Sequence, residues 1–208
     1  MLMVLLGLAA CVHVPEPTAD FRLLSEPPPS MRIVLFPPSC TQDDGVCEDV
    51  DLSSLNALLR TELEFDGHTI VDGVTLVNQA RSRAEQDIAL TRFGEQLAGL
   101  SSVAQQGSLF DDLPPAARRA LLTEARADAV LRSTVAFGPV DPNSGVSRYR
   151  QITVQTRLGL GEDEAPAWVA RCARTGAKIN NVNSQGVENY DLTLAALGGC
   201  VIEQARSQ

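Results

Sequence analysis

Histidine and closely spaced cysteines are both scarce in this chain of 208 residues. The histidines are His13 and His68, and no two of the five cysteines form a Cys-x-x-Cys arrangement. Structural zinc sites combine pairs of cysteines or histidines at short spacing. The sequence therefore gives no basis for a metal site, and we expect no cofactor.

Common catalytic motifs are also missing. There is no Gly-x-Ser-x-Gly segment, and Thr175-Gly176-Ala177-Lys178 lacks the serine of a Ser-x-x-Lys motif. Gly159-Leu160-Gly161 precedes Glu162-Asp163-Glu164, whose carboxylates would repel a pyrophosphate. Five further acidic residues do not have the spacing of the ligands in an EF-hand calcium loop. They precede a predicted helix, and their negative charges interact favourably with the positive end of its dipole. These residues are Asp43, Asp44, Glu48, Asp49 and Asp51.

Lysine is nearly absent, since Lys178 is the only one, and acids outnumber bases to give a net charge of −9. The arginines are scattered along the chain. An acidic protein repels phosphate backbones and anionic lipid headgroups. We therefore expect no binding to nucleic acid and no polybasic attachment to a membrane.

Long hydrophobic runs are limited to the first ten residues, Met1–Ala10. A bilayer-spanning helix needs about 20 apolar residues, whereas the apolar region of a signal peptide needs about 7 to 15. The ending Leu8-Ala9-Ala10-Cys11 resembles a bacterial lipobox, although no Lys or Arg precedes it. The resemblance implies a signal peptide over residues 1–10, removal of that peptide, and diacylglycerol and a further fatty acid such as palmitate on Cys11.

The domain organisation follows from proline content. Residues 11–30 carry Pro15, Pro17 and Pro27-Pro28-Pro29 without apolar periodicity, which predicts a semi-rigid tether. Residues 31–208 are long enough to form a single globular domain. Val12, the residue after the modified cysteine, favours sorting to the outer membrane, with the domain facing the periplasm.

Four cysteines remain when Cys11 is assigned to lipid, and an even number in an exported chain indicates two disulfides. Four cysteines allow three connectivities. We favour Cys40 with Cys47, which closes a short loop, and Cys172 with Cys200, which joins a predicted strand to the last helix.

Hydrophobic periodicity predicts a strand at Met31–Phe36, a helix over Leu52–Leu63 capped by Asp51 and ended by Gly67, and a strand at His68–Val71. Further helices are expected at Val74–Ala84 and after Pro114, and residues 86–108 are helix-prone without a clear pattern. Three antiparallel strands and a final helix follow; they are expected near Ala129–Phe137, Ser147–Leu160, Pro166–Ala173 and Val187–Ala205. This order predicts an α/β (α+β) domain, with helices packed on a mixed sheet of about five strands.

A family resemblance is carried by three segments. They are the first strand, the helix that precedes the strand His68–Val71, and Arg126–Leu131, where a predicted helix is followed by a strand. They resemble the small α/β domain of envelope lipoproteins and translocation factors: the curli-secretion lipoprotein, the penicillin-binding-protein activators and the amino-terminal domain of TolB. The chain also resembles uncharacterised lipoproteins of myxobacterial type. The resemblance covers about Met31–Arg206 and carries over no functional residues.

Two arginines, the tryptophan and one histidine are candidates for a functional role. Arg148 and Arg150 on one predicted strand are weak candidates for binding an acidic partner, since charges on a sheet edge more often prevent aggregation. Trp168 is interpreted as a core residue, and His68 as a half-exposed strand residue and not an acid-base group.

These observations favour a non-enzymatic adaptor or accessory subunit of the bacterial envelope, held at the membrane by its lipid and bound to an envelope protein. The alternative is a lipoprotein hydrolase that acts on cell-wall or glycan material through paired carboxylates. A subunit of a secretion channel would need long amphipathic insertions, and residues 86–108 lack the required alternation.

Overall fold

The computed structural model describes residues 16–41, 47, 50–84, 115–143, 149–161, 164–178, 181–182 and 188–207. The predicted signal peptide, Cys11, Arg148 and the helix-prone segment 86–108 lie outside these ranges. In chain order, the elements are β1 (Thr18–Leu23), β2 (Arg32–Leu35), β3 (Ser39–Thr41), α2 (Ser53–Phe65), β4 (Thr69–Asp72), α3 (Gly73–Ala84), α6 (Pro115–Ala125), β5 (Ala129–Val140), β6 (Tyr149–Leu160), β7 (Ala165–Lys178), β8 (Asn181–Val182), β9 (Glu188–Asn189) and α7 (Asp191–Arg206).

The main sheet has seven strands in the order β1-β7-β6-β5-β2-β4, with β3 also paired to β5. The pairs β1–β7, β7–β6 and β6–β5 are antiparallel, whereas β2 is parallel to both β5 and β4, and β3 is parallel to β5. β8 and β9 form a separate two-stranded ribbon. The predicted α/β class with a mixed sheet is confirmed, with seven strands in place of about five.

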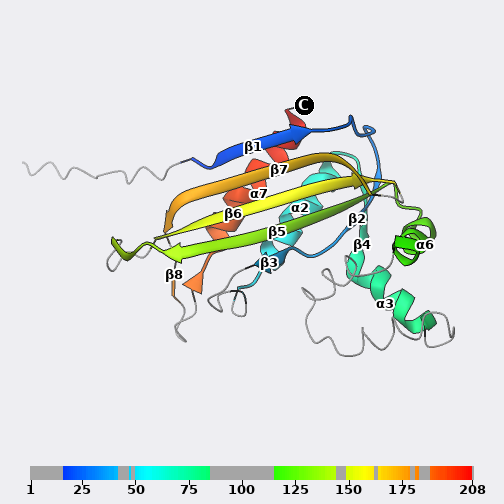
Figure 1. Cartoon of the computed structure of the whole chain (residues 1–208), viewed down its shortest axis with the longest axis horizontal. Helices are drawn as coiled ribbons and strands as arrows, with labels where there is room; N and C mark the ends of the chain where they lie inside the picture. The colour runs from blue at the N-terminus through cyan, green and yellow to red at the C-terminus, as the bar shows by residue number, and fades with distance from the viewer. Residues whose placement is uncertain are drawn as a thin grey trace, which may run out of the picture.

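Helices α2 and α7 cover one face of this sheet and lie behind the strands in Figure 1. The leucine stripe predicted for α2 is buried there at Leu55, Leu59 and Leu63. α7 packs closely on α2, since a Cβ at Gly198 would lie 2.8 Å from Leu55 Cδ1. None of the helices in the described ranges is long and apolar enough to cross a bilayer.

The end of α2 follows the prediction for Gly67. The Gly67 and His68 N–H groups donate to the Glu64 and Leu63 carbonyls, both at 3.1 Å, and Gly67 has φ +87°. These two bonds form a Schellman motif, in which glycine adopts the left-handed conformation at low cost. The motif turns the chain directly from α2 into β4.

Helices α3 and α6 cover part of the opposite face, over the parallel strands. Their small core takes the alternate side chains of β2 and β5, because successive residues of a strand point to opposite faces. It contains Val34, Phe36, Leu76, Val77, Leu121, Leu122 and Val130. This second layer leaves the antiparallel strands β1, β7 and β6 clear of α3 and α6 in Figure 1.

Part of the predicted tether belongs to the sheet. Residues Thr18–Leu23 form β1, whose partners run from Ala173 back to Trp168 on β7. The Phe21 ring packs at 5.9 Å from that of Trp168, which is buried in the core as predicted. The folded domain therefore begins before Met31, and the tether prediction was wrong for this segment.

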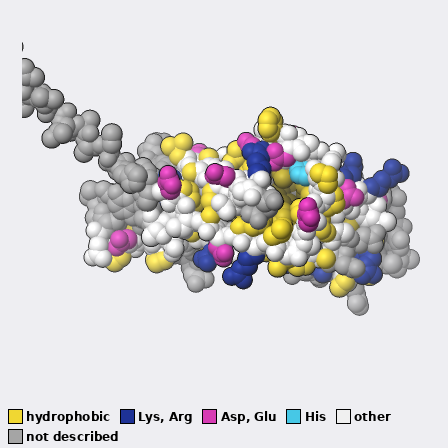
Figure 2. All heavy atoms as spheres, turned by 90° about the horizontal axis from the view of Figure 1, so that it is seen from above, with side chains coloured by type: hydrophobic (Ala, Val, Ile, Leu, Met, Phe, Trp, Pro, Cys, Tyr) yellow, Lys and Arg dark blue, Asp and Glu magenta, His cyan; other side chains and the backbone are white. Residues whose placement is uncertain are grey.

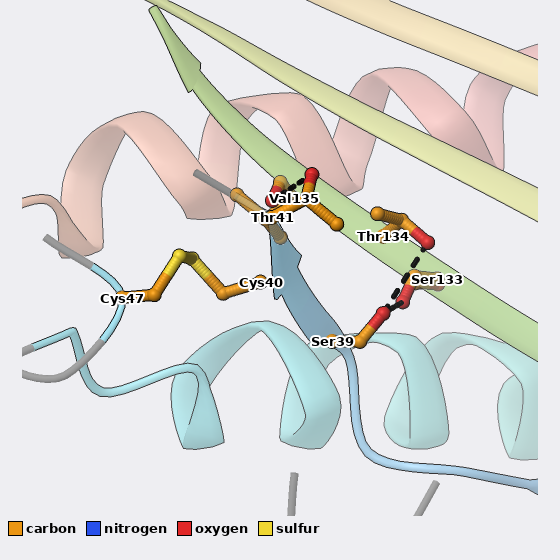
Figure 3. The surroundings of a disulfide bond; sticks show 7 residues. All are labelled: Ser39, Cys40, Thr41, Cys47, Ser133, Thr134 and Val135. Carbon is orange, nitrogen blue, oxygen red and sulfur yellow. Dashed lines mark hydrogen bonds between the residues drawn. A yellow bond between two sulfur atoms is a disulfide. The ribbon is translucent and has the colours of Figure 1, made fainter. Parts of the chain in front are cut away.

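The structure contains the two favoured disulfides. The Cys40–Cys47 bond joins β3 to the segment that follows it (Figure 3). Two side-chain hydrogen bonds hold β3 against β5. The Ser39 hydroxyl lies 3.3 Å from Thr134 Oγ1, and the Thr41 hydroxyl donates to the Val135 carbonyl. The Cys172–Cys200 bond joins β7 to α7. Each bond therefore ties a strand to a segment that follows it in the chain.

Candidate partner-binding surface

Arg150, a predicted partner-binding residue, is buried. It is 5% exposed, and its Nη1 donates to the Gly138 carbonyl at 3.1 Å. β6 lies between β5 and β7 and is not an edge strand. Arg150 therefore stabilises the β5–β6 pair and is not available to a partner, which corrects the sequence interpretation.

A different set of arginines lies on the sheet face opposite α2 and α7. We call this surface the arginine face and define it by Arg22 of β1, Arg171 of β7, Arg157 of β6 and Arg132 of β5. The first three are exposed, and Arg132 is half-buried. No helix in the described ranges packs over the centres of β1, β7 and β6 on this side (Figure 1).

Strand register aligns these arginines across the sheet. Val169 of β7 is opposite both Arg22 and Arg157, and Arg157 is opposite Arg132. In the adjacent row Asp20, Arg171, Gln155 and Thr134 are opposite one another in turn. Directly opposite residues lie about 5 Å apart at Cβ, so the two rows make a compact polar surface.

The turn between β6 and β7 supplies the counter-charge for Arg132. Glu164 is 8% exposed; its Oε2 accepts from Arg132 Nη2, and its Oε1 lies 3.5 Å from Arg118 Nε on α6. The turn adopts left-handed conformations at Gly161 and Glu164, and it lies so close to β6 that a Cβ at Gly159 would be 2.9 Å from the Glu164 carbonyl. Glycine at position 159 thus allows the turn to bring Glu164 to the arginines.

Burial lowers the pKa of Arg132, the nearby Arg157 charge lowers it further, and the Glu164 charge opposes both. Like charges directly opposite on neighbouring strands repel each other. The carboxylate of Glu164 binds Arg132 and Arg118, whereas Arg157 Nη2 donates to the backbone carbonyl of Glu164 at 3.4 Å. Asp20, on the same face, lies 3.7 Å from Arg22, and the arginines of this face still outnumber its acids on a protein whose net charge is −9.

A groove of about 400 Å³ lies between β4, α3 and α6. Two of its charged side chains already bind neighbours: Arg32 Nε donates to the Ala125 carbonyl at 2.7 Å, and Asp72 accepts from Arg60 and from the Thr75 N–H. These bonds join β2 to α6 and β4 to α2 and α3, so both side chains have a structural role. The lining residues are Arg32, Val71, Asp72, Thr75, Leu76, Gln79, Glu124, Ala125 and Arg126.

The sequence carried a signal for only part of this surface. Thr153, Gln155 and Arg157 alternate with the buried residues of β6, and this period-two pattern of the sequence indicates the solvent-facing side of the strand. Arg22 and Arg171 were missed because their strands were interpreted as a tether and as a short segment around Trp168. The residues that the structure describes contain no cluster of three or more His, Cys, Asp or Glu suited to a metal ion.

Comparisons with known proteins complete this description. No protein-family model matches the chain, and no curated protein matches it. Among solved structures, it is similar to the PelC dodecamer from Paraburkholderia phytofirmans, with 13% identity, 90% of this chain and 96% of that chain covered, and a TM-score of 0.48. It is also similar to lipoprotein GNA1162 from Neisseria meningitidis, with 16% identity, coverage of 85% and 99%, and a TM-score of 0.46. The LpoB C-terminal domain from Escherichia coli is a third such structure, with 17% identity, coverage of 69% and 81%, and a TM-score of 0.40.

Proposed function

We propose that this chain is a membrane-anchored lipoprotein of the bacterial cell envelope, and that it acts as a non-enzymatic adaptor that docks an acidic protein partner on the arginine face. The observation that carries the proposal is that Arg22, Arg157 and Arg171 lie in two adjacent rows of the same sheet face, on three neighbouring strands. The membrane anchor comes from the sequence of residues 1–11.

The arginine face has the chemistry of a recognition surface. A guanidinium group offers several donors in a planar arrangement that matches the two oxygens of a carboxylate. Arg157 and Arg171 stand on adjacent, hydrogen-bonded strands, so their spacing is fixed by the sheet and not by a loop. A partner with a strip of Asp and Glu side chains would meet opposite charges without a rearrangement of the backbone.

Reversal of two exposed arginines tests the docking surface. In the Arg157→Glu/Arg171→Glu variant, we expect crosslinking from membranes to recover about tenfold less of the envelope partner than in the wild type, because two attractive contacts become repulsive. Arg126→Glu is the matched control, since Arg126 is exposed beyond the end of α6 and beside the groove.

Two results would contradict this role. The first is recovery of the wild-type chain only as an uncomplexed protein from membranes at native abundance. The second is release of soluble fragments from purified cell-wall material by the wild-type chain, which would favour the carboxylate hydrolase.

The membrane anchor has its own test. The resemblance of Leu8-Ala9-Ala10-Cys11 to a lipobox supports a lipid on the Cys11 sulfur, and the resemblance of Val12 to common sorting signals supports the outer membrane with the domain facing the periplasm. Three acyl chains hold a protein at a bilayer nearly permanently, since each buried methylene contributes about 0.8 kcal/mol. Palmitate labelling should mark the wild-type chain and not Cys11→Ala, and equal labelling of both would contradict the anchor.

A further inference from the structure

β1 is the outermost strand on one side of the sheet. Within the described residues it pairs with β7 alone, so its other edge presents backbone N–H and C=O groups to its surroundings. Open edges of this kind are templates for pairing with another strand. Figure 2 looks onto this side of the molecule, where hydrophobic side chains lie beside charges of both signs.

The two faces of β1 differ in chemistry. Asp20 and Arg22 belong to the arginine face, where their side chains are 60% and 74% exposed and lie 3.7 Å apart. Ala19, Phe21 and Leu23 point to the side of α2 and α7. Phe21 is half-buried and Leu23 is 45% exposed, so this apolar row is incompletely covered within one chain.

We propose that two copies of this chain form a homodimer by antiparallel pairing of β1 with β1, with Phe21 of each copy opposite Phe21 of the other. In this register Asp20 lies opposite Arg22 on one face, and Ala19 lies opposite Leu23 on the other. Both matches occur twice because the interface has two-fold symmetry.

Other registers match less well. A shift of one residue places the charged face of one strand against the apolar face of the other, because side chains alternate with a period of two. A shift of two residues places Asp20 opposite Asp20, or Arg22 opposite Arg22, and like charges directly opposite repel. The strand is therefore self-complementary in one register, in both charge and hydrophobicity.

The two-fold axis of this pairing is perpendicular to the sheet. The two arginine faces consequently lie on the same side and form one continuous surface, with α2 and α7 of both copies on the other side. Dimer formation does not depend on the proposed adaptor role, because pairing of β1 with β1 needs no acidic partner. It would double the positive surface available to a partner.

Charge reversals test the register on the full chain in membranes, with two differently tagged copies expressed together. Wild-type copies should co-purify. Asp20→Arg copies should co-purify about tenfold less with one another, as should Arg22→Asp copies, because each interface then carries like charges twice. Asp20→Arg should co-purify with Arg22→Asp at the wild-type level, since the mixed pair restores opposite charges.

Asp20 is opposite Arg171 of β7 in its own copy, and the mixed pair restores the charges between copies but not this contact, so recovery of the mixed pair assigns the loss to the β1–β1 interface. Three results would overturn the dimer: failure of wild-type copies to associate, association that is insensitive to both reversals, or failure of the mixed pair to recover. Recovery of a different protein along β1, in place of a second copy, would also overturn it.

Cysteine crosslinking measures the register directly. A disulfide requires Cα atoms within about 7 Å. Copies with Ala19→Cys should therefore crosslink to copies with Leu23→Cys. Neither variant should crosslink to itself, because the equivalent residues are then about 14 Å apart along the strands. Self-crosslinking of either variant at the level of the mixed pair would overturn the register.

Discussion

Glu164 joins three elements of the protein through one carboxylate. Its oxygens bind Arg132 of β5 and Arg118 of α6, while its own backbone lies in the turn that leads into β7. A buried ion pair of this kind contributes little net stability relative to an apolar substitute, but loss of one partner leaves a buried charge without compensation.

Glu164→Gln should therefore lower the free energy of unfolding by about 3 kcal/mol, because the charge of Arg132 stays half-buried and its counter-charge is removed. Urea unfolding with the disulfides intact measures this change. Glu203→Gln is the control, since Glu203 is exposed on α7 and should change stability by less than about 0.5 kcal/mol. A similar small change for both variants would show that Glu164 does not balance a buried charge.

His68 acts as a hydrogen-bond acceptor at the start of the β2–β4 pair. Its Nδ1 accepts the Met31 N–H at 3.2 Å, and the Thr69 N–H donates to the Met31 carbonyl at 2.8 Å. Burial lowers the pKa of His68, and the charge of Asp66 opposes this shift in part. The folded state therefore favours neutral imidazole, as the accepting Nδ1 requires.

The pKa of His68 is lower in the folded than in the unfolded protein, so its contribution to stability is complete above about pH 6.5 and decreases as the pH falls through the folded-state value. Thermal unfolding between pH 7 and pH 5 should show a larger fall in Tm for the wild type than for His68→Asn. The asparagine oxygen can accept the Met31 N–H and does not titrate. Parallel Tm curves for the two proteins would contradict this assignment.

Helices α2 and α7 show how one small residue determines the distance between two elements. They run in the same direction, since Gly198 meets Leu55 and Leu58 of α2, and Arg206 binds Glu62 and Asp66 at the end of α2. Gly199, the next residue of α7, has open space around the position of a Cβ. Two neighbouring glycines of one helix thus differ in packing alone.

Gly199→Ala should raise the free energy of unfolding by about 0.5 to 1 kcal/mol, because alanine has the higher helix propensity. Gly198→Ala gains the same propensity but places a methyl group 2.7 Å from Leu58 Cδ2 and 2.8 Å from Leu55 Cδ1. Overpacking of this kind costs about 1 to 3 kcal/mol, so Gly198→Ala should be the less stable of the two. Chemical unfolding measures the free energy of unfolding of both variants. Equal values would mean that α2 and its leucine side chains move aside without cost.

Elements defined by local pattern could be predicted from the sequence. The leucine spacing located α2, Gly67 located its end, and alternation located the buried side of β6. The same alternation explains the error at Arg150, which has the parity of Ile152 and Val154 and therefore lies on the buried side of its strand. Charge alone suggested exposure at that position, and strand geometry overrode it.

Elements defined by distant partners could not be predicted in this way. β1 is six residues long and lies between two proline-rich stretches, so its local pattern resembles that of a linker. Its hydrogen-bond partners on β7 are about 150 residues further along the chain, as in the bond from Thr18 Oγ1 to the Ala173 carbonyl. The arginine face depends on this pairing, because Arg22 joins the row only when β1 docks on β7.

The distribution of charge over the whole molecule connects the fold to the proposed role. A net charge of −9 limits non-specific association with anionic surfaces. Against this background, the arginines of the arginine face would attract the acidic partner that we propose to that side of the sheet. β1 connects this surface to the predicted anchor, because Arg22 belongs to the arginine face and the residues before β1 lead to Cys11.

Removal of β1 distinguishes a tether from a structural strand. The free energy of unfolding should be lower by about 2 kcal/mol or more for a chain that begins at Glu26 than for a chain that begins at Glu16. The shorter chain loses the β1–β7 hydrogen bonds and the contact between Phe21 and Trp168. Both chains lack Cys11, so the comparison is independent of lipid. Guanidinium unfolding measures the difference. Equal stability of the two chains would mean that residues 16–25 serve only as a spacer, and both Arg22 and the β1 edge would then lose their structural basis as binding surfaces.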